Sequence, residues 1–404
     1  MLRSPRVSGP RALRILLSAG LFSGALPQAA RAQFPWTGAR ATGMGGAQVA
    51  AVDDATAAWS NPAALARLGG WTVQLFGGGL GSNRNNLLGT VDRLSGLPFD
   101  EIARGNRLDL LPGLLDDLNR LTRSDTGVLF SGVGGLVVSG HGFALSGGVV
   151  PYAGIAPVVD LTHVVPGGGV GNGLAFNESG LSFRGLEARE VRLAYGRVFA
   201  SVLEVGGAAR LVFGRTFFTR CGVFDCGGEN LEELIRDAFH KNARDSTDFT
   251  FDLGARLNLG IVKLGVVGAS LNEPTFEVAP VPGAPASVAL PRQVRGGVSV
   301  DALPFLSVAA DADLLESDTL VPGAHSRQVS LGAEVRLPLF ALRAGAMRDL
   351  AATDPHWTYS VGLGVSAALV AVDVGILMSP RGGLDPTSLN REDLAGAANV
   401  RVQF

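Results

Sequence analysis

The chain has 404 residues, a formal net charge of -2 and a mean hydropathy of +0.27. The near-neutral charge offers no basic face, which argues against nucleic acid as a partner. After the first thirty residues or so, no apolar run reaches the roughly 18 residues that a membrane-spanning helix needs. High hydropathy without such a helix leaves a large buried sheet or a membrane β-barrel, in which apolar residues alternate along each strand.

The N-terminus has the pattern of a signal peptide. Four arginines precede a short apolar stretch from Ile15 to Ala25, and Ala30-Arg31-Ala32 fits a cleavage site. The apolar stretch is too short for a single anchor helix. We therefore expect residues 1–32 to be removed on export, so that the mature chain starts at Gln33.

Small residues dominate the next segment, 33–70, which is too rich in glycine and alanine to build a core of its own. Asp53 and Asp54 are predicted to cap a short helical turn with their carboxylates at its positive end. Asn61 is predicted to cap a second turn, with Pro62 at its first position. We interpret this segment as a small N-terminal hatch, or plug, whose walls another part of the chain supplies.

From Trp71 onward the apolar residues recur with a period of two, which indicates β-strands with one apolar and one polar face. Between Asp248 and Leu259, for example, phenylalanines and leucines alternate with polar residues. Fourteen such runs can be drawn, most of them near the ~9–11 residues of a tilted membrane strand. They are 71–79, 127–138, 143–151, 187–198, 202–214, 248–258, 262–271, 291–301, 304–314, 326–337, 340–348, 356–366, 369–379 and 396–404.

The connections between these runs are alternately short and long, as in an up-and-down barrel of an outer membrane. The longer loops are expected at about 80–126, 152–186, 215–247 and 272–290. The final alternating run ends on Phe404, a terminal aromatic that looks like the C-terminal signature of outer-membrane barrels. We predict an all-β fold in which 71–404 form a 14-stranded antiparallel up-and-down transmembrane β-barrel, in the outer membrane of a diderm (Gram-negative) bacterium.

The loops carry predicted helical insertions on the extracellular side. Leucines between Leu108 and Leu121 recur at helical spacing, so an amphipathic helix is expected there, either as a lid or membrane-surface element or packed on neighbouring loops. A second helix is expected at 229–241, and the proline-rich loop 272–290 is expected to be extended. Cys221 and Cys226 are close enough in sequence to close a small loop disulfide, which fits an exported chain better than a metal site.

The predicted strands place charges of both signs on the face that would line the barrel. One interpretation is a hydrated, charged path; the other, which the balance of signs favours, is pairing across neighbouring strands, because an unpaired buried charge is costly. The polar residues expected to face the lumen include Arg192, Arg210, Asp252, Arg256, Arg295, Glu334 and Arg336.

Catalytic motifs are missing from the sequence. It contains no G-x-S-x-G, H-E-x-x-H or P-loop pattern, and its five histidines are scattered. No enzymatic activity, catalytic residue, cofactor or metal is therefore expected.

Three motifs resemble the N-terminal hatch of the FadL superfamily: Gly43-Met44-Gly45-Gly46-Ala47, Asp53-Asp54-Ala55-Thr56-Ala57 and Trp59-Ser60-Asn61-Pro62-Ala63-Ala64-Leu65. That group includes long-chain fatty acid transporters, PorV-like secretion barrels and conjugal-transfer TraF-like barrels. The resemblance implies a hatch that occludes the barrel, with Asp53, Asp54, Trp59, Asn61 and Pro62 as candidate gate residues. The leucine-rich first loop looks more like the TraF-like or PorV-like branches.

The resemblance leaves two functions open. The first is passive transport of hydrophobic, fatty-acid-like molecules across the outer membrane, gated by the hatch, in some members with movement sideways into the membrane. The second is a secretion-associated or structural barrel whose extracellular loops bind protein partners. Outer-membrane lipid is an expected partner in both cases, and a fatty-acid-like ligand or detergent in the barrel is expected in the first.

Overall fold

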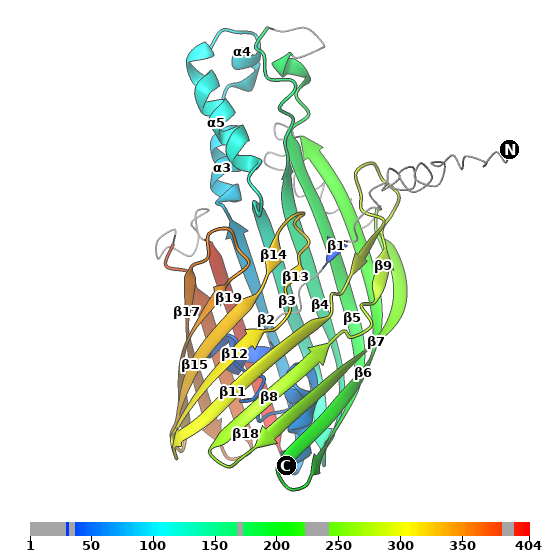
Figure 1. Ribbon diagram of the computed structural model, residues 1–404, viewed down its shortest axis with the longest axis vertical. Helices are drawn as coiled ribbons and strands as arrows, with labels where there is room; N and C mark the ends of the chain where they lie inside the picture. The colour runs from blue at the N-terminus through cyan, green and yellow to red at the C-terminus, as the bar shows by residue number, and fades with distance from the viewer. Residues whose placement is uncertain (1–29, 32–36, 168–172, 223–241, 382–391) are drawn as a thin grey trace, which may run out of the picture.

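The computed structural model describes residues 30–31, 37–167, 173–222, 242–381 and 392–404. Within these residues, fourteen strands close into one antiparallel barrel (Figure 1). The ring closes where the last strand pairs with the first, with Ala397 opposite Gly78. The barrel strands are β2 Trp71–Arg84, β3 Gly127–Gly140, β4 Phe143–Val158, β5 Gly180–Phe199, β6 Leu203–Gly222, β7 Arg244–Asn258, β8 Val262–Ala269, β11 Gln293–Leu303, β12 Leu306–Asp313, β15 Gln328–Arg336, β16 Phe340–Asp349, β17 Trp357–Ala367, β18 Val370–Met378 and β19 Asp393–Gln403.

All fourteen predicted strands are confirmed, although several extend beyond their predicted ends. The expected loops 152–186 and 215–247 are too long, because β4 continues to Val158 and β6 continues to Gly222. The alternation of apolar and polar residues does not predict these strand ends. In β6, Phe217 and Phe218 are adjacent, and the end of β2 contains glycines, which have no side chain to alternate. The result is an uneven wall in which β5 and β6 have 20 residues each, while β8 and β12 have 8.

Short turns join the strands at one end of the barrel, and the longer loops lie at the other end (Figure 1). The turn between β3 and β4 consists of His141 and Gly142, whose φ angles are 53° and 86°. Two successive positive φ values match the twist of paired strands, which explains how two residues reverse the chain. The predicted alternation of short and long connections is confirmed.

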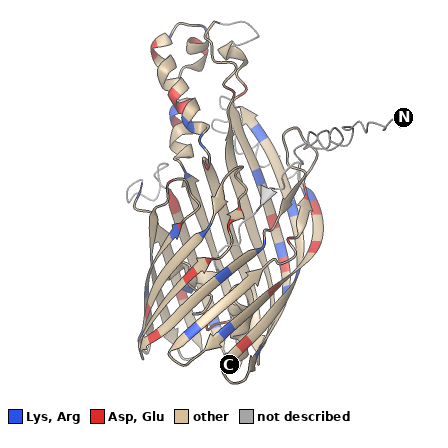
Figure 2. Cartoon of the chain, in the orientation of Figure 1, with Lys and Arg blue, Asp and Glu red and all other residues tan. Residues whose placement is uncertain are grey.

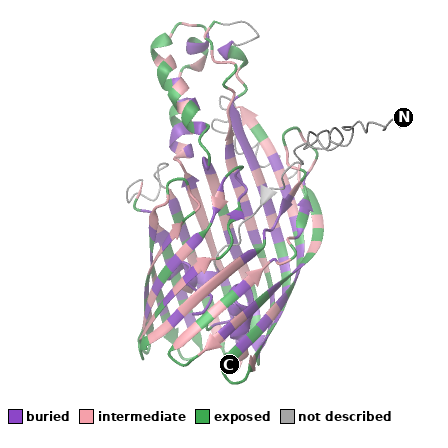
Figure 3. Ribbon diagram, in the orientation of Figure 1, coloured by how far each residue is buried: buried purple, intermediate pink, exposed green. Residues whose placement is uncertain are grey.

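The outer face of the barrel is apolar. Along β18, Val370, Val372, Val374 and Ile376 are exposed, whereas Ala371 and the other intervening residues are buried. Figure 3 shows the same alternation of buried and exposed residues along the other strands, and in Figure 2 most of the barrel ribbon is neither acidic nor basic. An apolar outside around a polar inside is the arrangement of a barrel in lipid. Exposed aromatic side chains gather near the short turns: Trp71, Phe143, Tyr195, Phe305, Phe340 and Phe404.

The hatch, defined here as residues 37–68, lies inside the barrel at the short-turn end (Figure 1). Its elements are α1 Gly38–Gly43, α2 Ala57–Ser60 and η1 Pro62–Arg67. The first packs against β17, β18 and β19, and η1 packs against β5, β6 and β7, so the hatch reaches across the lumen. Its backbone approaches the wall closely: a Cβ at Gly345 would lie 2.3 Å from the carbonyl carbon of Met44. Small residues are therefore required on both sides of this contact.

The first long loop forms a helical tower above the barrel, made of α3 Leu87–Ser95, α4 Phe99–Ala103, η2 Leu108–Leu110 and α5 Leu111–Leu121. The predicted helix is present, but its buried side consists of Leu114, Leu118 and Leu121, and Leu108 is exposed. These leucines share a core with Leu87 and with η3 Leu174–Phe176 from the second loop, so the helix packs on neighbouring loops. Within the described residues, no helix is long and apolar enough to cross a membrane.

Two further loops form short strands. The loop 272–290 is extended as expected and contains β9 Thr275–Glu277 and β10 Ser287–Ala289, joined by β1 Ala30–Arg31 from the predicted cleavage site. The loop after β12 contains β13 Ser317–Asp318 and β14 His325–Ser326. The helix expected at 229–241 lies outside the described residues. So does Cys226, and the disulfide with Cys221 at the end of β6 stays a prediction.

Candidate functional site

The N-terminal half of the hatch is bound to the wall by a cluster of ions around Glu334 on β15. The Glu334 carboxylate is fully buried, and both of its oxygens accept hydrogen bonds from the Nε and Nη2 of Arg40 at 3.0 Å. Arg336 Nε donates to the same carboxylate at 2.7 Å, and Arg343 Nε donates at 2.6 Å. Asp53 completes the cluster by accepting hydrogen bonds from Arg40 and Arg336. Asp53 is therefore an ion-pair partner, and its predicted capping role is wrong.

A second ion cluster lies on the opposite wall, where β5, β6 and β7 meet the other half of the hatch. Arg192 and Arg210 each pair with both Glu190 and Asp252, and all four side chains are almost completely buried. The Arg192 guanidinium stacks 4.0 Å from the centre of the Trp59 ring and donates a 3.0 Å hydrogen bond to a hatch carbonyl. Charges that would be costly alone are thus neutralised and hydrogen-bonded.

Asn61 joins the two halves of the hatch. Its side chain is fully buried, accepts a hydrogen bond from Ala63 N at 3.2 Å and donates one to Val49 O at 2.9 Å. It is the N-cap of η1 with Pro62 at the first position, as the sequence predicts, although the turn is a 3-10 helix. Asp54 accepts a hydrogen bond from Thr56 N at 2.9 Å in the turn before α2, where Thr56 is the N-cap.

The remaining lumen-facing residues are also paired. Arg256 binds Glu204 and donates a 2.7 Å hydrogen bond to Val52 O of the hatch, and Arg295 binds Asp313 at 2.8 Å. Asp311, Arg40, Glu190 and Glu204 were not predicted as site residues. Asp311 accepts hydrogen bonds from Gln48 N and Val49 N at 2.7 and 2.8 Å. The hatch is therefore tied to the wall by charged groups on several sides.

Two cavities lie on either side of the hatch. The lower cavity, about 460 Å³, is lined by Arg40 and Asp53 of the hatch and by residues of the β11–β12 turn. The upper cavity, about 320 Å³, lies between the hatch and the long loops and is lined by the upper ends of several strands. Tyr152 lines the upper cavity and shares a core cluster with Trp59 of the hatch. The hatch therefore borders the lower cavity directly and approaches the upper one through the packing of Trp59.

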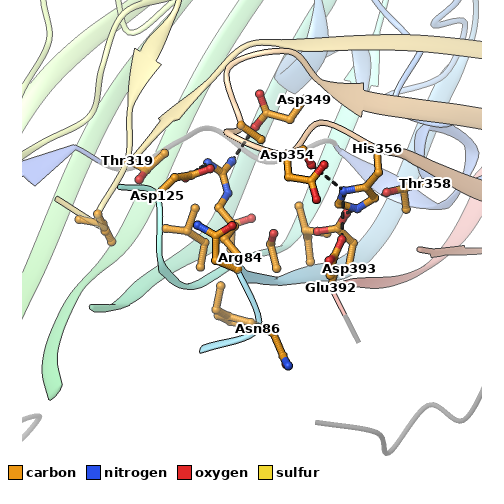
Figure 4. A pocket seen from close by; sticks show the side chains of 18 of the residues that line it. Arg84, Asn86, Asp125, Thr319, Asp349, Asp354, His356, Thr358, Glu392 and Asp393 are labelled. Atoms are coloured by element: carbon orange, nitrogen blue, oxygen red, sulfur yellow. Dashed lines mark hydrogen bonds and ion pairs between the residues drawn. The ribbon is translucent and has the colours of Figure 1, made fainter. Parts of the chain in front are cut away.

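The wall of the upper cavity is held together by Arg84, which lies in its centre in Figure 4. This guanidinium is 10% exposed and pairs with Asp125 from the first loop and with Asp349 from β16. It also donates a 2.8 Å hydrogen bond to His325 O of β14. One buried cation thus joins four separate segments of the chain around the cavity.

His356 makes a second polar contact on the same wall (Figure 4). Its Nε2 lies 3.0 Å from Asp393 Oδ2, and its Nδ1 lies 3.1 Å from Glu392 Oε2. The hydrogen bond to Asp393 raises the pKa of His356 above its ordinary value, although partial burial acts in the opposite direction. Among the described residues, no cluster of His, Cys, Asp and Glu is arranged to hold a metal ion.

The apolar side of the upper cavity reaches the barrel wall. Phe130 and Ala153 line the cavity. Each is the sequence neighbour of an inward-facing residue, Ser131 on β3 and Tyr152 on β4, and so belongs to the outward-facing set of its strand. The pairing of β3 with β4 is interrupted at two positions of β3. Ser131 and Gly134 are paired with β4, whereas Gly132 and the residue after it are not. The residue opposite Gly132 in this register is Pro151, which has no N–H to donate.

The comparisons with known proteins agree with this architecture. A family model described as "F plasmid transfer operon, TraF, protein" matches residues 113–313, just under half of the chain. No curated protein matches the sequence.

Several solved structures resemble the chain over nearly its whole length. The toluene transporter TodX of P. putida matches with a TM-score of 0.53 and 12% identity, over 91% of this chain and 98% of its own. The toluene transporter TbuX of Ralstonia pickettii gives 0.51 and 14%, over 91% and 98%. A Pseudomonas aeruginosa FadL homologue gives 0.51 and 12%, over 92% and 99%. The expected resemblance is thereby confirmed for the fold: the chain has the barrel fold of these structures.

Proposed function

We propose that this protein is a passive outer-membrane channel for small hydrophobic molecules, gated by its hatch. The fold neighbours that transport toluene support this function by analogy of fold. The observation that carries it in this chain is the upper cavity: it is partly apolar, lies directly above the hatch, and reaches the barrel wall at Phe130 and Ala153. Its 320 Å³ falls at the lower end of the range typical of small-molecule sites.

The proposed route enters between the long loops and leaves sideways through the wall between β3 and β4. In this proposal the hatch closes the axial route, because its ion pair with Glu334, its hydrogen bond from Arg192 and its close backbone contacts hold it across the lumen. Between β3 and β4, by contrast, the ladder is interrupted opposite Pro151 and the cavity lies against the interruption. A hydrophobic molecule that leaves here enters lipid without passing the ion clusters.

The test is uptake of labelled toluene into liposomes that contain the purified protein. Faster uptake than into empty liposomes is expected, and equal rates would refute transport. The lateral route is tested by Pro151→Val, which restores an N–H opposite Gly132 and should slow uptake. Pro157→Val is the matched control, because Pro157 lies on the same strand beyond the last residue that pairs with β3. If the two variants behave alike, the lateral route is wrong.

Export through a cleaved signal peptide belongs to the same proposal. We propose that the leader 1–32 is cleaved, which N-terminal sequencing of the protein from native membranes would test. Cleavage after Ala32 would also remove the β1 strand, so that the edge of β10 loses a neighbour.

A second candidate function, binding of protein partners, is favoured by the match to the TraF family model and by the position of the helical tower. The tower has its own leucine core and stands above the barrel at the long-loop end. Cross-linked affinity purification from native membranes, with the wild-type chain and with a variant that lacks residues 87–121, tests it. A partner recovered only with the wild-type chain supports this function, and the same proteins recovered with both chains refute it.

A further inference from the structure

The outer wall of the barrel carries charged side chains in the half that is nearer the long loops. Its outward-facing arginines include Arg189 on β5, Arg215 on β6 and Arg348 on β16. Alternation along the strands gives their direction, because the neighbours Glu190 and Met347 are buried. On this face an exposed side chain meets lipid or the headgroup region, where a cation without an anion beside it is costly.

Two of these arginines obtain their anion from the wall itself. Arg189 lies 2.6 Å from a carboxylate oxygen of Glu187, two residues away on the same face of β5. Arg215 lies 3.7 Å from a carboxylate oxygen of Asp245, which is its register partner on β7. The β5–β7 side of the wall therefore neutralises its own outward-facing cations.

Arg348 has no such partner. It ends the outward-facing series of β16, which is apolar below it at Leu342, Ala344 and Ala346. Its guanidinium lies 6.0 Å from the ring centre of Trp357, its register partner on β17, and it pairs with no described carboxylate. Its Nε is covered and makes no hydrogen bond, so the two terminal nitrogens are the donors left for a ligand.

A second cation lies beside Arg348. The exposed Arg327 comes directly before β15, two residues from Val329, which pairs in register with Arg348. Such diagonal neighbours are about 7–8 Å apart, within reach of long side chains. Arg327 Nε donates a 3.4 Å hydrogen bond to Asp313 O, and among the described residues no carboxylate forms an ion pair with it. We call Arg327, Arg348 and Trp357 the rim site.

The exposed carboxylates of the adjacent loops are already paired. Asp354, between β16 and β17, pairs with Arg381 at 2.5 Å. Asp318 and Glu316, in the loop after β12, lie 2.8 and 3.7 Å from His325 Nδ1. An anion that neutralises the rim site therefore has to come from outside the described chain.

We propose that the rim site binds a phosphate group of lipid A, the phosphorylated glycolipid of the outer leaflet. Guanidinium groups bind phosphate oxygens through paired hydrogen bonds, and tryptophan is enriched at the level of the headgroups. The site lies at the long-loop end, which is the extracellular end of the predicted topology. Below it, Tyr359 and Val361 of β17 are 57% and 63% exposed and offer an apolar surface to the acyl chains. This inference is independent of what the channel transports.

Titration of the full-length protein in detergent with diphosphoryl lipid A, followed by native mass spectrometry, tests the proposal. Wild-type protein should bind the lipid, and Arg348→Gln should bind it about tenfold more weakly, the effect of one charge-assisted hydrogen bond. Lipid A without its phosphates should bind both proteins equally weakly. Arg189→Gln is the matched control, because Arg189 also faces outward but is paired with Glu187; it should bind lipid A as the wild type does. Heat-modifiable migration confirms that each variant is folded.

Three results would overturn the proposal. Equal binding of lipid A by wild type and Arg348→Gln would show that this arginine does not hold the phosphate. An equal loss in Arg189→Gln would show a general effect of surface charge. Phosphatidylglycerol that binds as tightly as lipid A would show that the site takes any lipid phosphate. Toluene uptake by Arg348→Gln should match that of the wild type, so each of these failures leaves the channel function untouched.

Discussion

Substituting Glu334→Gln should release the N-terminal half of the hatch. Glu334 is a buried carboxylate that accepts hydrogen bonds from three guanidinium groups, of Arg40, Arg336 and Arg343. Of these three only Arg40 belongs to the hatch, so this carboxylate ties the hatch to β15 and β16, beside the second tie that Arg336 makes to Asp53. Glutamine keeps the shape of the side chain and removes the charge that holds the three cations together.

The expected magnitude follows from the burial of the cluster. Glu334 is fully buried, and Arg343 and Arg40 are 6% and 12% exposed, so the substitution leaves cations in a poorly solvated site. Loss of one partner of a buried pair costs about 3–5 kcal/mol. The lower figure is appropriate, because Arg336 and Asp53 are 49% and 41% exposed, and solvent screens their electrostatic interactions with the rest of the cluster. About 3 kcal/mol raises the ratio of undocked to docked hatch roughly 150-fold.

Single-channel recording in planar bilayers measures this change. Wild-type protein should stay closed to ions, and Glu334→Gln should show frequent openings, while heat-modifiable migration of the folded barrel is unchanged. Asp301→Asn is the matched control: Asp301 pairs with Lys263 at 2.9 Å on the wall near the same end and does not contact the hatch. Openings as rare as in wild type, or equally frequent in the control, would refute the role of Glu334 as the tie of the gate.

Two further predictions concern the hatch and the loops. Asn61→Ala removes the cap of η1, at a cost of about 1 kcal/mol, and the donor to Val49 O; pore conductance should change while the barrel stays folded, and unaltered conductance would argue against gating by this cap. His356 has a pKa raised by Asp393, so its ion pairs add stability that is complete below about pH 6.5 and is lost as the pH rises through the raised value. Melting curves should show wild type converging on His356→Gln with rising pH, and a constant difference would contradict this.

The barrel was predictable from the sequence because its physical constraint is local. Each strand between lipid and lumen must alternate apolar and polar residues, and β18 has this pattern along its whole length. The predicted strand ends were wrong where a strand leaves the region between lipid and lumen. Above the apolar band, β5 lies under the loops and is buried on more than one face, as Ser182 and Phe183 show by their adjacent burial. No period of two survives there.

The upper cavity was not predictable, because its residues share no local pattern. Arg84 ends one strand, Asp125 precedes another, and Asp349 and His356 flank a loop that lies more than 200 residues later. Each of them is an isolated charged residue in the sequence. They meet only because strand register brings the upper ends of β2, β16 and β17 to one level. Polar residues at strand ends next to long loops are the signal that could have indicated the site.

The ties of the hatch and the wall beside the upper cavity differ in a way that favours the lateral route. Moving the hatch as a body would break the buried ion pair of Arg40 with Glu334, at a cost of several kcal/mol, and the contacts of Arg192 with Ala58 O and the Trp59 ring. Widening the gap between β3 and β4 would break only the ladder hydrogen bonds next to Gly132, each worth about 0.5–1.5 kcal/mol. A small molecule binds too weakly to meet the first cost but can meet the second. For the proposed channel, this difference favours a lateral exit for small ligands, with the hatch as the gate of the axial route.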